Sequence, residues 1–523
     1  MNILYCTQSS SLRLFHSVNS ALDSNDISVE SVGFTIADSY NYEQWLNDNS
    51  SFEKGGYHIL KEWEVTDKRN AKPDLDKLAA YEKELGGEAG LFGAIVADRR
   101  MFMGPDCTYS QDYRRRFSDD ELLCILQHGL EEMERLFNEL KPDVLVSFIS
   151  VTMLDYLAYL FAKARGVRIF NLRPTRIGDR VSFSNMLNDP SPELSAAYFK
   201  LEQGSDSKYK QDAKDYIKRV KEKHGRYEGV IKPSDKPALK VNTSQFMKLG
   251  GVLRLVGNYI RYRRSISAKD NHVADPLRNI IFNLWKNPRR AKKANSLLKD
   301  EYISGKALKK LRYVFYPLHT EPEVSLLVYG RPYVNQIEVI RMLAMSLPID
   351  TVLLIKEHPW MVGKRSLASY KKLLNIPRVM IADPKQDARI LIQESDMIAV
   401  ITGSVALEAA LIGKPVLTLG DCPYNLLPDS MIRRCDDPRR LQSIIRELLE
   451  EYNYDDVALE NYVAGVMETS VGVNLYSVLL EKKNVYIERG STYNDEIEKL
   501  ANYLHLLIND GLESLNTEYS AKW

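Results

Sequence analysis

The sequence predicts an α/β protein with two Rossmann-like domains that face each other across a cleft. Two distant segments, 141–172 and 396–419, carry the same succession of apolar strand, polar turn, helix, glycine and second apolar strand. A strand, a helix and a second parallel strand connect in a right-handed unit, so each segment predicts a parallel sheet. The 523 residues, 44% of them hydrophobic, are enough for two to three separate cores.

Residues 1–190 are expected to form the N-terminal domain. The apolar run 2–6 predicts a first strand, and a polar turn leads from it into a helix over 12–22. Much of 35–115 is rich in tyrosine and irregular in pattern, and no element is predicted there. The repeat over 141–172 then supplies a further strand, helix and strand.

Three arginines follow the last of these strands and should point toward the cleft: Arg173, Arg176 and Arg180. Their guanidinium groups would suit a carboxylate or phosphate of an acceptor or sugar. Surface cations paired with Asp179 are an equally good interpretation.

Residues 191–310 differ in character and are expected to form a helical basic insert or linker. Within 246–264 no acidic residue occurs. Apolar residues recur there at helical spacing, and cations lie between them: Phe246, Leu249, Leu253, Val256 and Ile260, with Lys248, Arg254, Arg261, Arg263 and Arg264. A helix of this kind can lie on an anionic membrane surface. It can equally be a solvated helix docked on the protein, because Gly250, Gly251 and Gly257 weaken it.

Residues 311–480 are expected to form the C-terminal Rossmann-like domain, and 481–523 a helical tail. The tail has Ile497, Leu500, Leu504 and Leu507 on one helical face, so it should pack back across the domains.

The candidate nucleotide site lies in the C-terminal domain, where an apolar run ends in Thr402, Gly403 and Ser404. Small polar side chains and backbone N–H groups at a helix N-terminus favour a phosphate. Glu408, about one turn further on, could accept two hydrogen bonds from a ribose diol. The alternative is a serine that merely caps a helix.

A second polar group follows the strand-like run 351–355, where Lys356 precedes Glu357 and His358. Ligands of open α/β sheets bind beyond the carboxyl ends of the strands. If this strand and the one before Thr402 are neighbours, Lys356 and His358 would lie beside Ser404. Lys356 would then contact phosphate and His358 would donate to the leaving phosphate. His358 could otherwise be an ordinary polar loop residue.

The run Glu408-Ala-Ala-Leu-Ile-Gly-Lys-Pro-Val416 resembles the ribose-binding segment of GT-B glycosyltransferases. Together with the His358-Pro359 and Thr402-Gly403-Ser404 elements it resembles capsule-type polysaccharide biosynthesis proteins. These include bacterial Kdo transferases and are more distantly similar to bacterial sialyltransferases. The resemblance covers roughly 312–425. It implies a GT-B-like fold whose C-terminal domain holds the nucleotide and whose N-terminal domain holds the acceptor.

The catalytic base is left open by the sequence. Bacterial sialyltransferases carry two acids and a glycine for this role, and this chain shows no convincing match. Asp179, Glu321 and Glu323 are the carboxylates to test, although Glu321 or Glu323 could equally cap a helix or face solvent. No Asp-x-Asp stands in an obvious metal-binding context and the histidines are dispersed, so neither a metal nor a separate cofactor is indicated.

Composition limits the partners and the compartment. A net charge of +1 argues against nucleic-acid binding driven by the overall field. The five cysteines are scattered and read as reduced thiols, and neither a signal peptide nor a long apolar span is recognised, so a cytoplasmic protein is expected. Through the basic insert, the protein would bind peripherally to the inner face of the plasma membrane.

The favoured function is a metal-independent glycosyltransferase that moves a sugar from a nucleotide-sugar donor to a cell-surface polysaccharide or glycolipid acceptor. The donor would be a CMP-linked ulosonic acid or otherwise a UDP- or GDP-sugar. One alternative is a nucleotide-sugar epimerase of the same two-domain form. Another is a non-catalytic partner in polysaccharide assembly or export.

Overall fold

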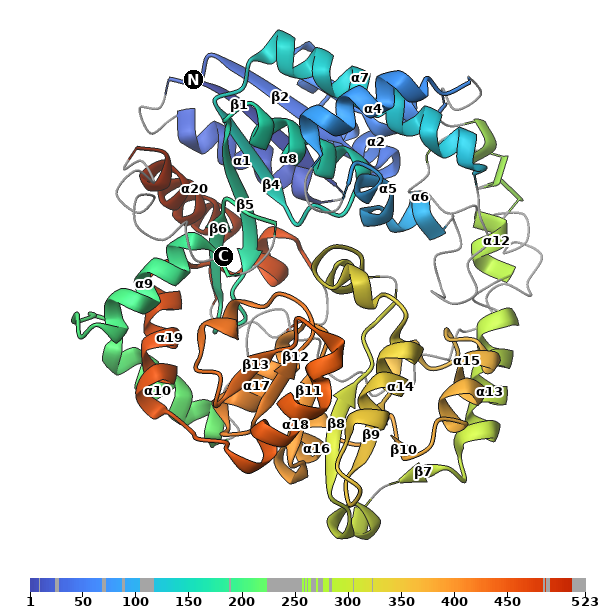
Figure 1. Ribbon diagram of the computed structural model, residues 1–523. Helices are drawn as coiled ribbons and strands as arrows, with labels where there is room; N and C mark the ends of the chain where they lie inside the picture. Colours follow the sequence, from blue (N-terminus) through green and yellow to red (C-terminus); the bar gives the residue numbers. More distant parts are fainter. Residues whose placement is uncertain are drawn as a thin grey trace.

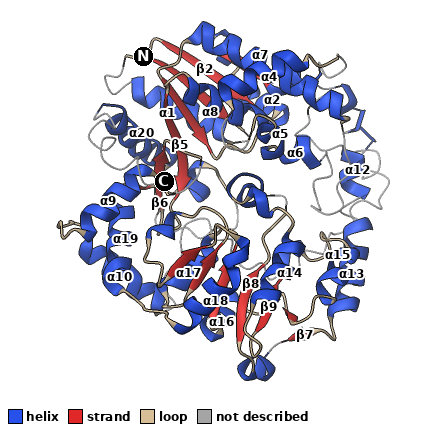
Figure 2. Ribbon diagram, in the orientation of Figure 1, coloured by secondary structure: helices blue, strands red, loops and turns tan. Residues whose placement is uncertain are grey.

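The computed structural model describes residues 1–8, 10–23, 28–67, 72–86, 90–103, 117–187, 190–222, 256–257, 259–260, 262–264, 270, 276–281, 285–303, 305–321, 323–482, 485 and 490–509. Two lobes face each other, the N-terminal lobe above and the C-terminal lobe below in Figure 1. Each lobe is a sheet covered by helices (Figure 2). The predicted pair of Rossmann-like sheets is confirmed.

The N-terminal sheet has the strand order β14-β6-β5-β4-β1-β2-β3. Its strands are β1 (Asn2–Thr7), β2 (Ser31–Ile36), β3 (His58–Lys61), β4 (Val144–Phe148), β5 (Arg168–Pro174), β6 (Arg180–Ser184) and β14 (Val471–Gly472). The run from β3 to β5 is parallel, whereas β6 pairs antiparallel with β5 and β14 antiparallel with β6. The helices are α1 (Ser11–Asp23), α2 (Ser39–Asp48), α3 (Glu62–Asp67), α4 (Leu75–Leu85), α5 (Gly93–Ala97), α6 (Arg99–Met103), α7 (Asp119–Leu140) and α8 (Met153–Ala164). The tyrosine-rich region without a predicted element thus forms β3 and five of these helices.

The C-terminal sheet is entirely parallel, in the order β13-β12-β11-β8-β9-β10-β7. Its strands are β7 (Tyr302–Ile303), β8 (Tyr313–Pro317), β9 (Val352–Lys356), β10 (Val379–Ala382), β11 (Met397–Val400), β12 (Val416–Thr418) and β13 (Ile432–Arg434). Its helices are α13 (Asn287–Leu298), α14 (Gln336–Ser346), α15 (Leu367–Leu374), α16 (Ala388–Glu394), α17 (Ser404–Leu411), α18 (Leu441–Glu450) and α19 (Asp456–Glu468). Both sheets have a doubly wound order around a central strand, β1 in the N-terminal sheet and β8 in the C-terminal sheet.

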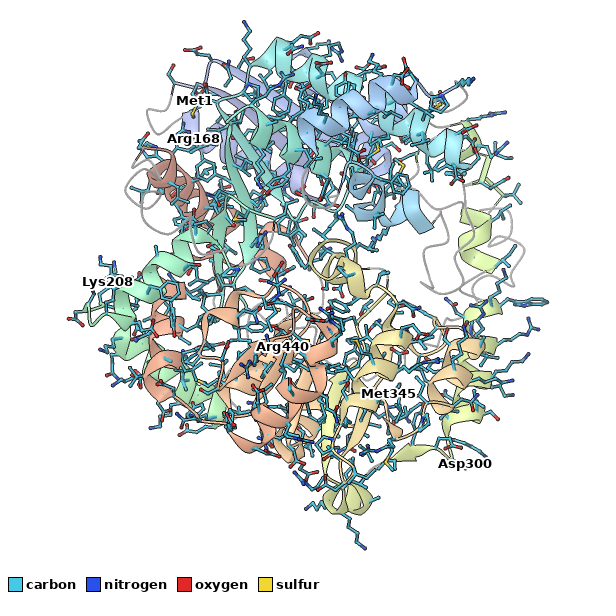
Figure 3. The ribbon with its side chains drawn as sticks, in the orientation of Figure 1. Met1, Arg168, Lys208, Asp300, Met345 and Arg440 are labelled. Atoms are coloured by element: carbon cyan, nitrogen blue, oxygen red, sulfur yellow. The ribbon has the colours of Figure 1, made fainter. Side chains whose placement is uncertain are left out.

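The segments at the domain boundaries cross between the lobes. Helices α9 (Pro192–Glu202) and α10 (Lys210–Lys221) pack on α19 of the C-terminal lobe. Strand β14 then returns to the N-terminal sheet, and α20 (Tyr493–Asn509) packs on α1. Arg168, at the start of β5, donates to the carbonyl oxygen of Ile508 at 2.8 Å and fixes the end of α20 (Figure 3).

These crossings change the lobe to which parts of the predicted insert and of the predicted C-terminal domain belong. The first part of 191–310 belongs to the C-terminal lobe through α9 and α10, which bury apolar faces on α19, and so does the last part through α13 and β7. The predicted C-terminal domain ends earlier than 480, since β14 is part of the N-terminal sheet. Most of the predicted basic helix over 246–264 lies outside the described residues.

Candidate functional site at the carboxyl ends of the C-terminal strands

The strand order places the crevice of the C-terminal lobe between β8 and β11. In a doubly wound sheet the connections leave in opposite directions on either side of the central strand, here β8, and ligands bind at that point. The sequence interpretation put Lys356 and His358 beside Ser404 on condition that β9 and β11 are neighbours. In the structure β8 lies between them. The residue that faces the Thr402–Ser404 turn across the crevice is therefore His319, which follows β8.

Gly403 and His319 are in close contact. Gly403 has a φ of +120°, and a Cβ placed on it would lie 3.4 Å from His319 Cε1. Gly403 also occupies the N-cap position of α17, so no side chain caps this helix. Ser404 is the first residue of the helix and does not cap it. The first N–H groups of α17 thus start beside an imidazole ring, with the dipole of the helix favouring an anion there.

The backbone of His319 is held on both sides by Gln336, a fully buried side chain of α14. The His319 N–H donates to Gln336 Oε1 at 2.8 Å, and Gln336 Nε2 donates to the His319 carbonyl at 3.1 Å. Burial and the nearby Arg365 lower the pKa of His319 to about 4, so its ring is neutral near pH 7. Its buried Nε2 has no hydrogen-bond partner among the described residues. A buried polar atom without a partner calls for a water or a ligand.

Arg365 links the loops that follow β8 and β9. Its guanidinium pairs with Glu321 at 3.0 Å and with Glu357 at 2.8 Å, and the arginine is 3% exposed. Glu357 also accepts from the Tyr370 hydroxyl at 3.0 Å and from the His358 N–H at 3.1 Å. Glu321 is therefore an interior partner of Arg365 that stabilises the loop, and its carboxylate does not line the cleft.

Lys356, His358 and Lys364 form a group of nitrogen bases at the end of β9. Burial lowers the pKa of His358, and the charges of Lys356 and Lys364 lower it further, against the opposite influence of Glu357. Burial also lowers the pKa of each lysine, against the pull of Asp387, Glu357 and Asp383 on Lys356. An anion here would stabilise the charged forms of all three groups. No sequence motif pointed to Lys364.

Of the three arginines of the N-terminal lobe, two are engaged with the protein itself. Arg173 donates to the carbonyl oxygens of Met186 and Leu187. Arg180 donates to Ser470 Oγ at 2.8 Å and to the Met467 carbonyl at 2.7 Å, which ties β6 to the end of α19. Asp179 lies half-buried in the same β5–β6 turn, next to Gly472 of β14. These contacts stabilise the junction between the lobes, so Arg173 and Arg180 are engaged with the protein and not directed at a substrate.

Arg176 lies over the Tyr476 ring at 5.9 Å and also acts electrostatically on a carboxylate of the opposite lobe. Its charge and that of Arg99 act on Glu323, whose carboxyl pKa is raised by burial and lowered in part by these two cations. The Glu323 side chain itself is exposed to solvent. Among the three candidate bases, Glu323 is the one whose carboxyl pKa is influenced by cations of the other lobe, Arg176 and Arg99. A carboxyl of raised pKa in a cleft suits general acid–base chemistry.

The crevice of the N-terminal lobe, between β1 and β4, carries a strained residue. Ile149 has a φ of +49°, which a β-branched residue rarely adopts. Gln8 Nε2 donates to the carbonyls of Phe148 and Ile149 at 3.3 and 3.2 Å and holds the turn. The Oγ of Ser150 is buried without a partner in the described part of the chain. Strain of this kind is typical of functional sites, and no sequence pattern predicted it.

Comparisons with known proteins find a family match over the segment that contains the crevice residues. Residues 259–427 match the capsule polysaccharide biosynthesis protein family. The match includes His319, His358 and Glu408, so the resemblance expected from the motifs is confirmed over this segment. It supports a glycosyltransferase activity. No curated protein matches the chain.

Similar solved structures are distant in sequence. The KpsC β-Kdo 2,7-transferase of Thermosulfurimonas dismutans is 14% identical, with 71% of this chain and 89% of that chain covered and a TM-score of 0.33. The β-Kdo 2,4-transferase of the same KpsC is 11% identical, with 61% and 78% covered and a TM-score of 0.34. The UDP-GlcNAc 2-epimerase of Methanocaldococcus jannaschii is 12% identical, with 90% and 98% covered and a TM-score of 0.24.

Proposed function

We propose that this protein is a GT-B-type glycosyltransferase that moves a sugar from a nucleotide-sugar donor to a cell-surface polysaccharide or lipid-linked glycan. The observation that carries the proposal is the contact of His319 with Gly403 at the start of α17, at the crevice of the parallel sheet and within the segment that matches the capsule family.

The C-terminal lobe would hold the donor. Ser404 and the N–H groups at the start of α17 would bind phosphate, with Thr402 beneath them: its Oγ1 donates to the Ser325 carbonyl at 3.3 Å and fixes the turn. Glu408, one turn along the helix, would accept from the ribose hydroxyls. The neutral His319 ring would contact the same ligand from the β8 side.

The reaction would be a displacement at the anomeric carbon. The acceptor hydroxyl oxygen forms the new bond, the bond from the anomeric carbon to the phosphate oxygen breaks, and the hydroxyl proton passes to a carboxylate. Glu323 would accept that proton, a role supported by its raised carboxyl pKa and by the nearby charges of Arg176 and Arg99. Negative charge that develops on the departing phosphate would be stabilised by Lys356, His358 and Lys364.

A donor-consumption assay tests this function. The protein would be incubated with CMP-, UDP- and GDP-sugars, with and without glycans from the surface of the producing cell. We expect release of one nucleotide that depends on glycan and a matching gain in glycan mass. Conversion of the donor sugar without any glycan would indicate an epimerase. Binding of a nucleotide without turnover would indicate the non-catalytic role.

We also propose a peripheral position on an anionic membrane, supported by the surface around α12 (Pro276–Ile281) and α13. The segment 276–299 contains no acidic residue. Ile281 and Trp285 are 55% and 64% exposed, and Arg289 stacks on the Trp285 ring at 3.8 Å. Exposed cations lie beside them: Lys286, Arg289, Lys292 and Lys293. Apolar side chains among cations suit an interface with anionic lipid. None of the described helices is long and apolar enough to cross a membrane.

Liposome sedimentation tests this surface. Each basic side chain near an anionic membrane contributes about 1 kcal/mol, so Lys286→Glu with Lys292→Glu and Lys293→Glu should weaken binding by roughly a hundredfold or more. Lys208→Glu with Lys210→Glu and Lys214→Glu, around α10, is the matched control. Equal binding of all three proteins, or no binding of wild type to anionic vesicles at low salt, would contradict the proposal.

A further inference from the structure

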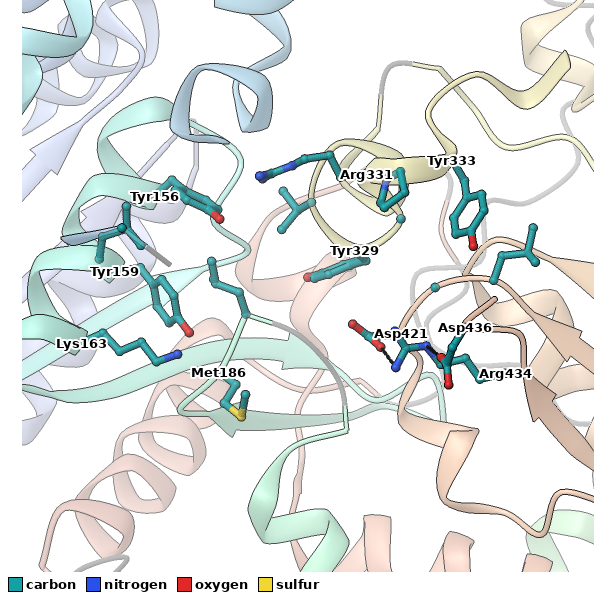
Figure 4. A pocket seen from close by; sticks show the side chains of 18 of the residues that line it. Tyr156, Tyr159, Lys163, Met186, Tyr329, Arg331, Tyr333, Asp421, Arg434 and Asp436 are labelled. Atoms are coloured by element: carbon teal, nitrogen blue, oxygen red, sulfur yellow. Dashed lines mark ion pairs between the residues drawn. The ribbon is translucent and has the colours of Figure 1, made fainter. Parts of the chain in front are cut away.

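A cavity of about 1000 Å³ lies between the lobes and has no role in the chemistry described so far. Its walls are α8 of the N-terminal lobe, the Tyr329–Tyr333 segment, and the ends of β12 and β13 (Figure 4). In the C-terminal sheet β12 and β13 lie on one side of the crevice, and β9 with its cationic group lies on the other. The cavity and the proposed leaving-group site therefore flank the crevice from opposite sides.

Tyrosine side chains from both lobes line the cavity. Tyr156 and Tyr159 are each 7% exposed, so their rings are packed in the protein while their hydroxyl ends point toward the cavity in Figure 4. Tyr333 lines the opposite wall. Within the described residues, the hydroxyls of these three tyrosines make no hydrogen bond to the protein. A hydroxyl both donates and accepts, so this wall suits a ligand rich in hydroxyl groups.

Some charged side chains of the lining form ion pairs with each other, and others have no such partner among the described residues. Arg434 forms ion pairs with Asp421 at 2.8 Å and with Asp436 at 3.2 Å. These pairs fix the position of the Arg434 side chain and make the wall at the ends of β12 and β13 polar. Lys163, on the same wall as Tyr159, has no acidic partner in the part of the chain that the structure describes. Arg331 projects between the lobes, donates to the Gly93 carbonyl at 3.3 Å and lies over the Tyr156 ring. Glu84 is the remaining acid of the lining.

The cavity extends beyond one sugar unit and reaches the donor crevice. A second cavity of about 280 Å³ adjoins it and shares Asp421, Arg434 and Asp436 as lining residues, and we call the two cavities together the groove. At the inner end, Gly420 lines the large cavity and lies against Thr402, since a Cβ on Gly420 would be 2.7 Å from Thr402 Cγ2. Pockets for small molecules occupy about 300–1,000 Å³, so a cavity of about 1000 Å³ with a neighbour of about 280 Å³ has room for more than one sugar unit.

We infer that this groove binds the saccharide chain of the acceptor, several sugar units long, with the tyrosine hydroxyls of α8 as hydrogen-bond partners and the growing end directed past Thr402 toward the donor. The inference rests on the proposed transferase function. It adds the position of the acceptor. It also adds that the protein recognises a chain of several sugars and not a single sugar.

Binding of glycan fragments tests the groove independently of turnover. Surface polysaccharide of the producing cell would be partly hydrolysed and separated by size, and fragments of one, two, four and six sugars titrated into the full-length protein by calorimetry. We expect affinity to rise with length. Tyr156→Phe with Tyr159→Phe removes only the two hydroxyls and keeps the rings packed, and should weaken binding of the longest fragment roughly tenfold, at about 1 kcal/mol or less for each hydrogen bond.

Two further measurements separate the possible failures. Tyr40→Phe, at a 51% exposed tyrosine outside the groove, is the matched control and should leave fragment binding unchanged. Nucleotide affinity should be the same in all variants, because the crevice is intact. Fragment binding that is independent of length, or equal in wild type and the double variant, would overturn the inference even if transfer occurs. Absent nucleotide binding with length-dependent, tyrosine-dependent glycan binding would instead refute the transferase function and keep the groove.

Discussion

The ring of His319 lies against Gly403, so that the loop after β8 and the start of α17 meet at the crevice of the C-terminal sheet. A side chain at position 403 would enter the space next to the imidazole. The pair also shows why a glycine is required there, since the φ of +120° belongs to a region that other residues rarely adopt. The predictions below concern this contact and the groups that hold it in place.

Gly403→Ala should abolish or strongly weaken nucleotide binding. The new Cβ strains the backbone and narrows the crevice, and the unfolding free energy should fall by about 1 kcal/mol or more. Gly166→Ala is the control, because Gly166 also has a positive φ of +67° but has nothing within 4 Å of an added Cβ. Thermal unfolding should show similar stability losses for the two variants. Calorimetry should show a nucleotide-binding defect in Gly403→Ala alone.

The stability of the protein should fall as the pH is lowered from about 6.5 to about 4. The pKa of His319 is depressed to about 4 in the folded state, so in this window the unfolded chain binds more protons at this residue than the native protein does. His319→Gln removes that difference and should give a flatter dependence of unfolding free energy on pH, measured by denaturant titration. An identical slope for both proteins would show that His319 titrates normally.

Arg365→Met should destabilise the protein by roughly 3–5 kcal/mol, because it leaves the Glu321 and Glu357 carboxylates buried without their cation. Arg135→Met is the control: Arg135 is half exposed and pairs with Glu132 and Glu139 on the surface of α7, so the loss should stay near 1 kcal/mol or less. Equal shifts of the melting temperature would mean that the Arg365 network contributes no more than a surface pair.

Glu408→Ala should weaken nucleotide binding by about 1–3 kcal/mol while the melting temperature of the free protein stays close to that of wild type, because a half-buried side chain at the crevice would lose its bond to ribose. Glu394→Ala, at an exposed glutamate at the end of α16, provides the comparison. Unchanged nucleotide affinity of Glu408→Ala would remove this residue from the donor site.

His358→Ala and Lys364→Ala should reduce kcat more than they reduce donor affinity. Both groups are placed to meet charge that grows on the departing phosphate, so their contribution is larger in the transition state than in the ground state. Single-turnover rates and donor titrations on each variant measure the two effects separately. Equal fractional losses would assign both residues to ground-state binding.

The architecture and one wall of the site could be predicted from the sequence. The apolar runs before Lys356 and Thr402 reveal strands and the polar residues at their ends, because these patterns are local. The order of the strands is not local, so the insertion of β8 between β9 and β11, and with it the role of His319, could not be seen. Likewise Glu321 is only two residues before Glu323 in the sequence, and packing of Glu321 against Arg365 separates their roles.

The central claim, that a nucleotide binds at the crevice between β8 and β11, is tested most directly by hydrogen exchange with a panel of CMP, CDP, UDP, GDP and TDP. One nucleotide at 100 times its dissociation constant should stabilise the protein by about 2.7 kcal/mol. The account predicts that it slows amide exchange most in peptides over 318–324 and 402–408. Protection confined to the N-terminal lobe, or no stabilisation by any of the five nucleotides, would contradict it.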